Sequence, residues 1–255
     1  MIDIHSHIIP CIDDGSKHID MTLEMLTMAS KSGTKKIVAT PHYFKGYWTP
    51  NYKEVVAEVE KLNELAKKNY IDIEIYPAQE VYFYDNMVEE FADGKIGTIN
   101  GSKYMLIELP MDSFDNNTFD VLYELEIRGV TPIIAHPERC KPFINNPSYI
   151  NKFIEEGYLF QLNGSSITGL FGKDVKKTAE IFLANGIYSF IGSDAHTTGK
   201  RNTYLIDALD TIESTKLGVI NEFHDNGKKL LNNENIDFQG KKIAKKKGFF
   251  SFFKK

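Results

Sequence analysis

The chain has 255 residues, of which 42% are hydrophobic and 25% are charged, so it is long enough to bury a sizeable core and we expect one globular domain. Its net charge of −5 hides an asymmetry, because residues 241–255 (KKIAKKKGFFSFFKK) carry seven lysines and no acid, which leaves −12 on the remainder. An acidic body argues against nucleic-acid binding, where basic residues must replace the counterions of the phosphates.

The cysteines and the N-terminus indicate the compartment. Cys11 and Cys140 lack the number and spacing of a disulfide framework or a zinc knuckle. No apolar run reaches membrane-spanning length, and the sequence opens directly into MIDIHSH, without a secretory leader. We therefore expect a cytoplasmic protein.

Short apolar runs rich in Ile, Val, Phe and Tyr alternate with amphipathic stretches, a pattern typical of an α/β fold with a parallel sheet or barrel. Apolar residues at helical spacing predict a helix over residues 52–68. Gly33, Gly129, Gly157 and Gly186 each precede a predicted strand, at a position that suits the C-terminal cap of a helix. The predicted strands span residues 2–5, 36–40, 72–78, 104–109, 131–135, 158–162 and 188–191.

Residues that follow the strands deserve separate attention, because parallel α/β folds form their sites at the carboxyl ends of strands. Six of the seven predicted strands are followed by residue types that bind metal ions. The sixth in order, which ends in FQLNGSS, supplies only amides and hydroxyls. The metal-binding types are, in chain order, His5 and His7 with Asp13 and Asp14, then His42, Glu80, Glu108, His136, and Asp194 with His196.

Imidazoles and carboxylates are suitable ligands for zinc, manganese and iron, and the alternation in HSH places both imidazoles on one side of a strand. Taken singly, each residue has a structural explanation as a cap, a surface group or a satisfied polar contact. Asp13 and Asp14 also suit a turn. As a set, converging carboxylates without cations would repel one another, so the set predicts a centre of divalent metal ions.

The segments HSH, DDGS, TPH, HPER and SDAH, together with Glu80 and Glu108, resemble the PHP family of metal-dependent phosphoesterases. Within that family the resemblance is to the bacterial tyrosine-protein phosphatases of the CpsB, CapC and YwqE type, and it covers roughly residues 1–230. It implies a distorted (β/α)7 TIM-like barrel, the PHP fold. We expect residues 1–240 to form this domain and residues 241–255 to form a basic, aromatic tail.

The resemblance also implies three metal ions. The mixture of oxygen and nitrogen ligands favours manganese, with iron or zinc as alternatives. The implied ligands are His5, His7, Glu80 and Asp194 for the first ion, the bridging Glu80 with Glu108 and His136 for the second, and Asp14, His42 and His196 for the third.

Two arginines lie beside these segments. Arg139, in HPER, is the best candidate to bind two phosphate oxygens at once, and its alternative is a salt bridge to a ligand carboxylate. Arg201, after SDAH, is a second candidate for contact with phosphate or substrate, or else an ordinary loop residue. The proton donor to the leaving group stays open between His42, Asp194 and a metal-bound water.

The implied function is that of a metal-dependent protein-tyrosine phosphatase, acting on a membrane-associated bacterial tyrosine kinase that controls capsule or exopolysaccharide synthesis. Cysteine-dependent phosphatases need Cys, five residues and then Arg, whereas Lys17 follows Cys11 and Asn146 follows Cys140 at that spacing. The first alternative is a small-molecule phosphoesterase such as a histidinol-phosphate phosphatase. The second is a metal-binding scaffold without catalysis.

Two groups of aromatic residues carry open alternatives. Phe249, Phe250, Phe252 and Phe253 lie among the tail lysines, so the tail either contacts an anionic membrane surface at the inner face of the membrane or is solvated. The second group follows the second and third strands, where it either lines a pocket for an aromatic ring or packs internally. It consists of Tyr43, Phe44, Tyr47, Trp48, Tyr82, Phe83 and Tyr84.

Overall fold

The structure is a computed structural model, and it describes residues 1–244. Within this range parallel strands form two sheets, with the orders β1-β2-β4 and β3-β5-β6-β7-β8-β9. The strands are β1 (Ile2–Ser6), β2 (Lys36–Ala39), β3 (His42–Tyr43), β4 (Glu74–Pro77), β5 (Glu80–Tyr82), β6 (Tyr104–Glu108), β7 (Thr131–Ala135), β8 (Leu159–Asn163) and β9 (Phe190–Gly192).

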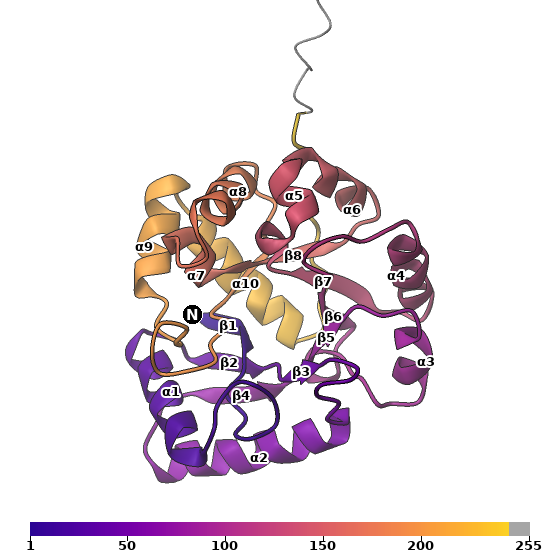
Figure 1. The fold of residues 1–255 in the computed structure, drawn as a ribbon. Helices are drawn as coiled ribbons and strands as arrows, with labels where there is room; N and C mark the ends of the chain where they lie inside the picture. Colours follow the sequence, from indigo (N-terminus) through magenta and orange to yellow (C-terminus); the bar gives the residue numbers. More distant parts are fainter. Residues whose placement is uncertain (245–255) are drawn as a thin grey trace, which may run out of the picture.

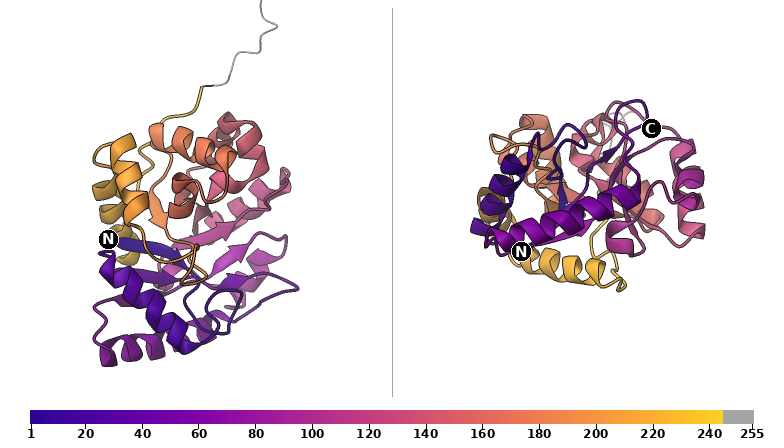
Figure 2. Two further views of the ribbon diagram at one scale, coloured as in Figure 1. Left: turned by 60° about the vertical axis from the view of Figure 1, so that its left-hand side comes forward. Right: turned by 90° about the horizontal axis from the view of Figure 1, so that it is seen from below.

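Helices lie around the outside of these strands, as Figures 1 and 2 show. The helices of the described residues are all too short or too polar to span a lipid bilayer. They are α1 (Ile19–Lys31), α2 (Tyr52–Lys68), α3 (Met87–Ala92), α4 (Asn117–Ile127), α5 (Lys141–Asn145), α6 (Asn151–Glu155), α7 (Gly164–Thr168), α8 (Lys173–Ala184), α9 (Ile206–Thr215) and α10 (Val219–Leu231).

The two sheets are connected, so the strands curl into a continuous surface. β3 follows β2 after Thr40 and Pro41, and it pairs with β5 as β2 pairs with β4. At the other end, Ser6 pairs with Ala195, and the backbone N–H of His7 donates to Ala195 O at 2.9 Å. The protein therefore has an α/β fold with a curled parallel sheet, as the alternation of elements predicts.

All seven predicted strands are present, and none of their ends is shifted by more than two residues. The short strands β3 and β5 were not predicted. Pro41 precedes β3 and has no backbone N–H for a ladder, which is why the sequence shows no separate strand there. Both short strands matter for the site, because β3 begins at His42 and β5 begins at Glu80.

Helix α2 spans the predicted residues 52–68. Asn51 and Glu54 form a capping box at its start, and Val55, Val59 and Leu62 bury the face that contacts β4. Full burial of an aliphatic side chain of this size contributes about 1.5–3 kcal/mol. The predicted cap glycines are confirmed as well: Gly33, Gly129, Gly157 and Gly186 have φ of 86°, 82°, 87° and 67°, which glycine adopts without strain.

Helix α10 crosses the amino ends of β1 and β9. Gly227 lies so close to Ile2 that an added Cβ would be 3.0 Å from the Ile2 side chain. The Asn226 amide donates to Ser189 O at 3.1 Å, just before β9. This end of the sheet is therefore covered, whereas the carboxyl ends of the strands carry the polar residues described below.

Candidate metal centre

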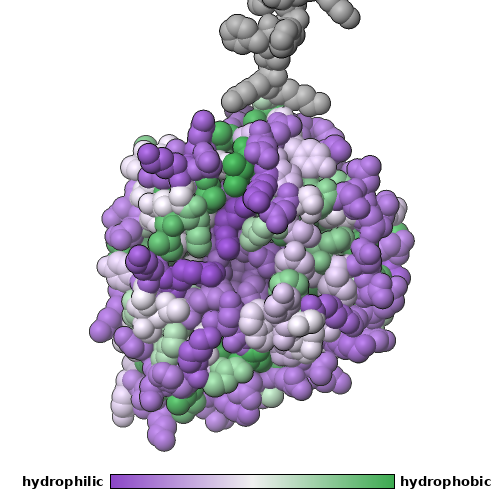
Figure 3. Space-filling model, viewed as in Figure 1, coloured by the Kyte–Doolittle hydropathy of each residue, from purple (hydrophilic) through white to green (hydrophobic). Residues whose placement is uncertain are grey.

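A hydrophilic pocket of about 470 Å³ lies at the carboxyl ends of the strands. Figure 3 shows a hollow in the middle of this face with hydrophilic residues gathered in it. Seven of the nine predicted ligands line the pocket, and His5 and His7 lie fully buried behind them. The seven are Asp14, His42, Glu80, Glu108, His136, Asp194 and His196.

The first group of converging side chains consists of His5, His7, Glu80 and Asp194, the four residues that the resemblance implies for the first ion. The Nε2 atoms of His5 and His7 are 3.2 Å apart, and each lies 3.2 Å from Glu80 Oε2. Asp194 Oδ1 is 3.6 Å from His5 Nε2 and 3.5 Å from His7 Nε2. The four ligand atoms lie within 4.8 Å of one another, a spacing that one metal ion can bridge.

Hydrogen bonds to the Nδ1 atoms of His5 and His7 fix the orientation of their imidazole rings. His5 Nδ1 lies 3.0 Å from the amide oxygen of Gln161, and His7 Nδ1 lies 2.7 Å from Asp13 Oδ2. Because both partners are acceptors, Nδ1 carries the hydrogen on each ring. In the neutral tautomers, the Nε2 lone pairs are then directed at each other and at the carboxylates, an arrangement that fits a cation.

The carboxylates around His5 and His7 also favour positive charge among these four side chains. Burial alone would lower the pKa of His5, but the Glu80 and Asp194 carboxylates raise it. Burial likewise opposes protonation of His7, and the Asp13 carboxylate nevertheless raises the pKa of His7 well above its usual value. Protons or metal ions satisfy the same requirement, and metal ions do so with all four ligand atoms at once.

The second group lies around the paired carboxylates of Glu80 and Glu108. The ligand atoms that lie within 4.8 Å of one another here belong to His42, Glu80 and Glu108. His136, which the resemblance implies for this ion, has Nε2 2.8 Å from Glu80 Oε1 and 3.9 Å from Glu108 Oε1. His42 also reaches the pair, with Nδ1 3.1 Å from Glu80 Oε2 and 3.9 Å from Glu108 Oε2. The structure thus brings His42 as well as His136 to these carboxylates.

The pKa values of the Glu80 and Glu108 carboxyl groups are shifted in opposite directions. Burial and the negative charge of Glu80 raise the pKa of Glu108 well above its usual value. Burial also opposes ionisation of Glu80, but the surrounding imidazoles of His5 and His42 hold its pKa well below the usual value. Glu80 Oε2 and His42 Nδ1 lie 3.1 Å apart, yet among the described residues neither of these buried atoms makes a hydrogen bond, and a metal ion would satisfy both.

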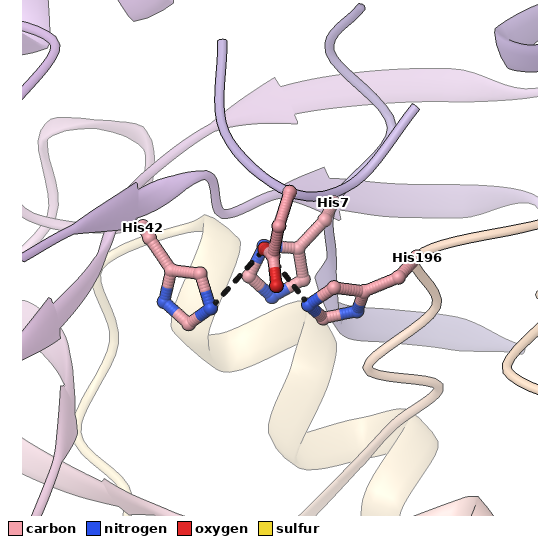
Figure 4. A group of neighbouring side chains, drawn as sticks. His7, His42 and His196 are labelled. Carbon is pink, nitrogen blue, oxygen red and sulfur yellow. Dashed lines mark ion pairs between the residues drawn. The ribbon is translucent and has the colours of Figure 1, made fainter. Parts of the chain in front are cut away.

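The third group consists of Asp14, His42 and His196, with His7 within reach of the same point. Figure 4 shows the imidazoles of His7, His42 and His196 turned towards one another. Asp14 Oδ1 lies 3.4 Å from His196 Nε2 and 3.6 Å from His42 Nε2. Burial opposes the charge on Asp14, but contact with His196 lowers its pKa below the usual value, so the carboxylate is ionised at neutral pH.

Both predicted arginines line the pocket, and both contact Asp194. Arg139 Nη1 is 2.9 Å from Asp194 Oδ2, and Arg201 Nη2 is 2.8 Å from Asp194 Oδ1. Arg139 therefore forms the salt bridge that was the alternative to phosphate binding, while its remaining N–H groups stay at the pocket. A guanidinium carries five N–H donors, so one ion pair does not exhaust it.

The strand that lacks predicted ligands supplies residues that orient the others. On β8, Gln161 contacts the ring of His5 and accepts from the backbone N–H of His136 at 3.2 Å. Asn163 donates to Asp194 Oδ2 at 2.6 Å. We did not predict these roles from the sequence. The signal was their spacing, because alternate residues of a strand face the same side.

Two residues of the centre have backbone conformations that L-amino acids rarely adopt. His136 has φ 29° and Asp194 has φ 50°. Such conformations cost about 1–3 kcal/mol each and occur mostly where a functional side chain must be directed. His136 follows β7 directly and Asp194 follows β9 after one residue, so the strain lies at the two points where the chain leaves the sheet towards the pocket.

The aromatic residues divide between the two predicted alternatives. Phe44, Trp48 and Tyr82 line the pocket, with the rings of Phe44 and Tyr82 stacked at 4.0 Å. By contrast, Tyr43 and Tyr84 donate to Glu90 Oε2 at 2.5 and 2.6 Å and belong to the packing behind it. One wall of the pocket is therefore aromatic, beside the metal-binding residue types.

The fold and this centre define an α/β protein whose candidate metal-binding side chains converge on a pocket at the carboxyl ends of its strands. Residues 1–232 match the family described as "Capsular polysaccharide synthesis, CpsB/CapC". The chain belongs to this family, and the predicted resemblance is confirmed.

Named relatives cover nearly the whole chain. Tyrosine-protein phosphatase YwqE of Bacillus subtilis (strain 168) is 32% identical over 256 residues, which cover 99% of this chain and 100% of the relative. Tyrosine-protein phosphatase CpsB of Streptococcus pneumoniae is 31% identical over 239 residues, with 91% of this chain and 98% of the relative covered. A similar solved structure comes from a set of YwqE from Bacillus subtilis and CpsB from Streptococcus pneumoniae, described as unique metal-dependent tyrosine phosphatases. It is 31% identical in sequence and has a TM-score of 0.91. The match covers 96% of this chain and 100% of that chain.

Proposed function

We propose that this protein is a metal-dependent protein-tyrosine phosphatase that acts on a bacterial tyrosine kinase regulating capsular or exopolysaccharide biosynthesis. The observation that carries the proposal is the convergence of three groups of metal-binding side chains on a pocket that also holds Arg139 and Arg201. The names of the relatives supply the phosphotyrosine specificity. Metal ions bound here would supply positive charge for the phosphoryl oxygens and would lower the pKa of a water molecule that attacks phosphorus.

We assign the ligands as three sets, with Mn²⁺ as the favoured ion and iron or zinc as alternatives. The position of His42 between Glu80 and Asp14 supports it as a neighbour of the second ion in addition to the third. The sets are His5, His7, Glu80 and Asp194, then Glu80, Glu108 and His136, and then Asp14, His42 and His196.

The chain's own residues account for substrate binding and limit the choice of proton donor. Arg139 and Arg201 bind the phosphate group through the N–H groups that Asp194 leaves free. Of the three candidates for the proton donor to the leaving oxygen, we favour a metal-bound water. His42 would direct both ring nitrogens at metal ions, because Nδ1 lies 3.1 Å from Glu80 Oε2 and Nε2 lies 3.6 Å from Asp14 Oδ1. Asp194 already accepts from Arg139, Arg201 and Asn163, which supports a role as their anchor.

The aromatic wall favours an aryl phosphate over the small-molecule alternative. Phe44, Trp48 and Tyr82 offer ring faces beside the centre, and aromatic pairs stabilise one another by about 0.5–1.5 kcal/mol beyond simple burial. A phosphotyrosine side chain has both the ring and the phosphate that these two parts of the pocket suit. The imidazole ring of histidinol phosphate is a weaker match because it is smaller and more polar.

The proposal also covers the type of barrel and the bounds of the domain. We propose that the curled sheet is a distorted (β/α)7 barrel, with β2 and β3 counted as one unit and β4 and β5 as another, in a domain of residues 1–240. Residues 241–255 would form the basic, aromatic tail, of which residues 245–255 lie outside the described residues. The main chain of Lys241 donates to Asn185 O at 2.9 Å, so the start of this segment contacts the body.

The tail would contact the anionic inner face of the membrane, near a membrane-associated kinase in the cytoplasm, with each lysine contributing about 1 kcal/mol. Sedimentation with vesicles containing phosphatidylglycerol measures this contact. We expect binding that weakens when Lys245, Lys246 and Lys247 are replaced by Gln. Equal sedimentation of both proteins would remove the membrane contact from the proposal.

Hydrolysis of a phosphotyrosine peptide tests the main proposal. Purified protein is assayed after chelation and again with Mn²⁺ restored, with His136→Ala as the control and histidinol phosphate as the competing substrate. We expect activity on the peptide that returns with Mn²⁺ and is absent from the variant. Preference for histidinol phosphate would favour the small-molecule enzyme, and bound metal without turnover on any phosphoester would favour a scaffold.

A further inference from the structure

A tight turn between α7 and α8 brings an aromatic ring to the two arginines of the pocket. Gly169 ends α7 with φ 96°, Gly172 precedes α8 with φ 98°, and the N–H of Gly172 donates to Gly169 O at 3.1 Å. The turn thus directs its two central residues to different environments. Leu170 is 41% exposed, whereas Phe171 is only partly exposed and packs towards the pocket arginines.

The ring of Phe171 lies against both guanidinium groups. Its centroid is 4.6 Å from Arg139 Cζ and 5.8 Å from Arg201 Cζ. Both distances fall within the range of about 6 Å in which a cation is attracted to a ring face. The three residues follow three different strands, namely β7, β8 and β9, so the contact depends on the folded sheet.

Each guanidinium is thereby held from two directions. The Asp194 carboxylate pairs with one N–H edge of Arg139 and of Arg201, and the Phe171 ring lies against the guanidinium groups. An ion pair alone leaves the plane free to tilt, which matters because two phosphate oxygens must be met by two parallel N–H groups. Buried Arg201 Nε has no hydrogen-bond partner among residues 1–244, so that donor does not restrain the plane.

We propose that Phe171 is a positioning residue that fixes the guanidinium planes of Arg139 and Arg201 for a phosphate group. This rests on the proposed function only in assigning the two arginines to phosphate. β8 and its connection would then support the site in two ways. Gln161 of the strand orients His5, and the connection that follows the strand carries the Phe171 ring. Phe171 does not belong to the lining of the pocket, so its effect reaches substrate through the arginines.

Arginine side-chain NMR tests the contact without any activity. The chain has three arginines, and the third, Arg128, pairs with Glu124 on the exposed face of α4, so its signal serves as an internal reference. In chelated, diamagnetic protein we expect Nε–H signals of Arg139 and Arg201 displaced by the ring current, with the larger displacement for Arg139. Phe171→Leu should abolish the displacement and Phe171→Tyr should retain it. Undisplaced signals in the wild-type protein would overturn the proposal.

Phosphate binding provides the functional readout. Calorimetric titration of inorganic phosphate into Mn²⁺-loaded protein should give a Kd about fivefold weaker for Phe171→Leu, and within about twofold of wild type for Phe171→Tyr. Leu170→Ala, in the same turn, is the matched control and should leave the Kd unchanged. Equal weakening by Leu and Tyr at position 171, or none by Leu, would contradict a role for the ring.

Peptide kinetics separate this proposal from the proposed function. If the wild-type protein hydrolyses phosphotyrosine peptide, Phe171→Leu should raise KM by about the same fivefold factor as the phosphate Kd, with bound metal unchanged. If the wild-type protein proves inactive on the peptide, the proposed function fails. The NMR and phosphate measurements still decide the role of Phe171.

Discussion

Gln161 Oε1 lies 3.0 Å from His5 Nδ1, so a residue of β8 orients an imidazole that is 156 residues away in the sequence. Loss of such a contact typically weakens metal binding 10- to 100-fold. We therefore expect Gln161→Leu to weaken metal affinity by roughly 10- to 100-fold in a competition titration with a chelator. Gln161→Glu keeps an acceptor for the ring N–H and should bind more tightly than Gln161→Leu. Equal affinities for wild type and Gln161→Leu would show that the hydrogen bond does not orient the ligand.

Removal of metal should destabilise the protein through its converging carboxylates. A ligand at 100 times its Kd stabilises a protein by about 2.7 kcal/mol, which corresponds to roughly 5–10 °C for a chain of this size. We expect chelation to lower the Tm of the wild-type protein by about that amount. Glu108→Gln should show a smaller fall, because it removes the repulsion between Glu80 and Glu108 in the metal-free state. Calorimetry of the four samples checks this expectation.

The aromatic wall should determine the choice of substrate. We expect Trp48→Leu to reduce kcat/KM for a phosphotyrosine peptide about tenfold, because a ring face beside the leaving group is lost. The same variant should change hydrolysis of glycerol phosphate by less than about twofold. Tyr123→Ala, at an exposed position on α4, is the control. A parallel loss on both substrates would mean that Trp48 supports the centre as a whole.

Glu90 predicts a pH dependence of stability. Burial opposes its ionisation, but Lys45, Tyr43 and Tyr84 donate to its carboxylate and lower its pKa from 4.5 to about 2. A folded-state pKa below the unfolded value adds stability above about pH 4.5, and this contribution is lost as the pH falls towards 2. The difference in unfolding free energy between wild type and Glu90→Gln should therefore shrink over that window. Urea unfolding at several pH values measures it, and a constant difference would contradict the shifted pKa.

The sequence indicated much of the fold and of the centre for a physical reason. A parallel strand is a short apolar run, and the few residues that follow it lie at the functional edge, so His136 and Asp194 could be located from local patterns alone. The pairing of partners was harder to predict. Asp13 and Asp14 are adjacent and chemically identical, yet Asp13 orients His7 while Asp14 faces His196.

Other contacts arise only when distant segments pack together. The position of His42 beside Glu80 depends on β3 resuming after Pro41, and no periodicity marks a two-residue strand. Gln161 and Asn163 lay on the correct face of a predicted strand, but an amide side chain is common in many settings, so its type alone carried little information. The contact of Phe171 with two arginines joins three connections of the sheet, which spacing along the chain does not reveal.

The position of α10 has a consequence for how such proteins diverge. Gly227 and Asn226 of this helix hold the starts of β1 and β9 from below, on the side away from the pocket. Connections on the pocket side, such as the one that carries Phe44 and Trp48, therefore do not have to hold these strands together. Insertions and exchanges there would alter which phosphorylated molecule is accepted, while the same framework keeps the metal-binding side chain types in place.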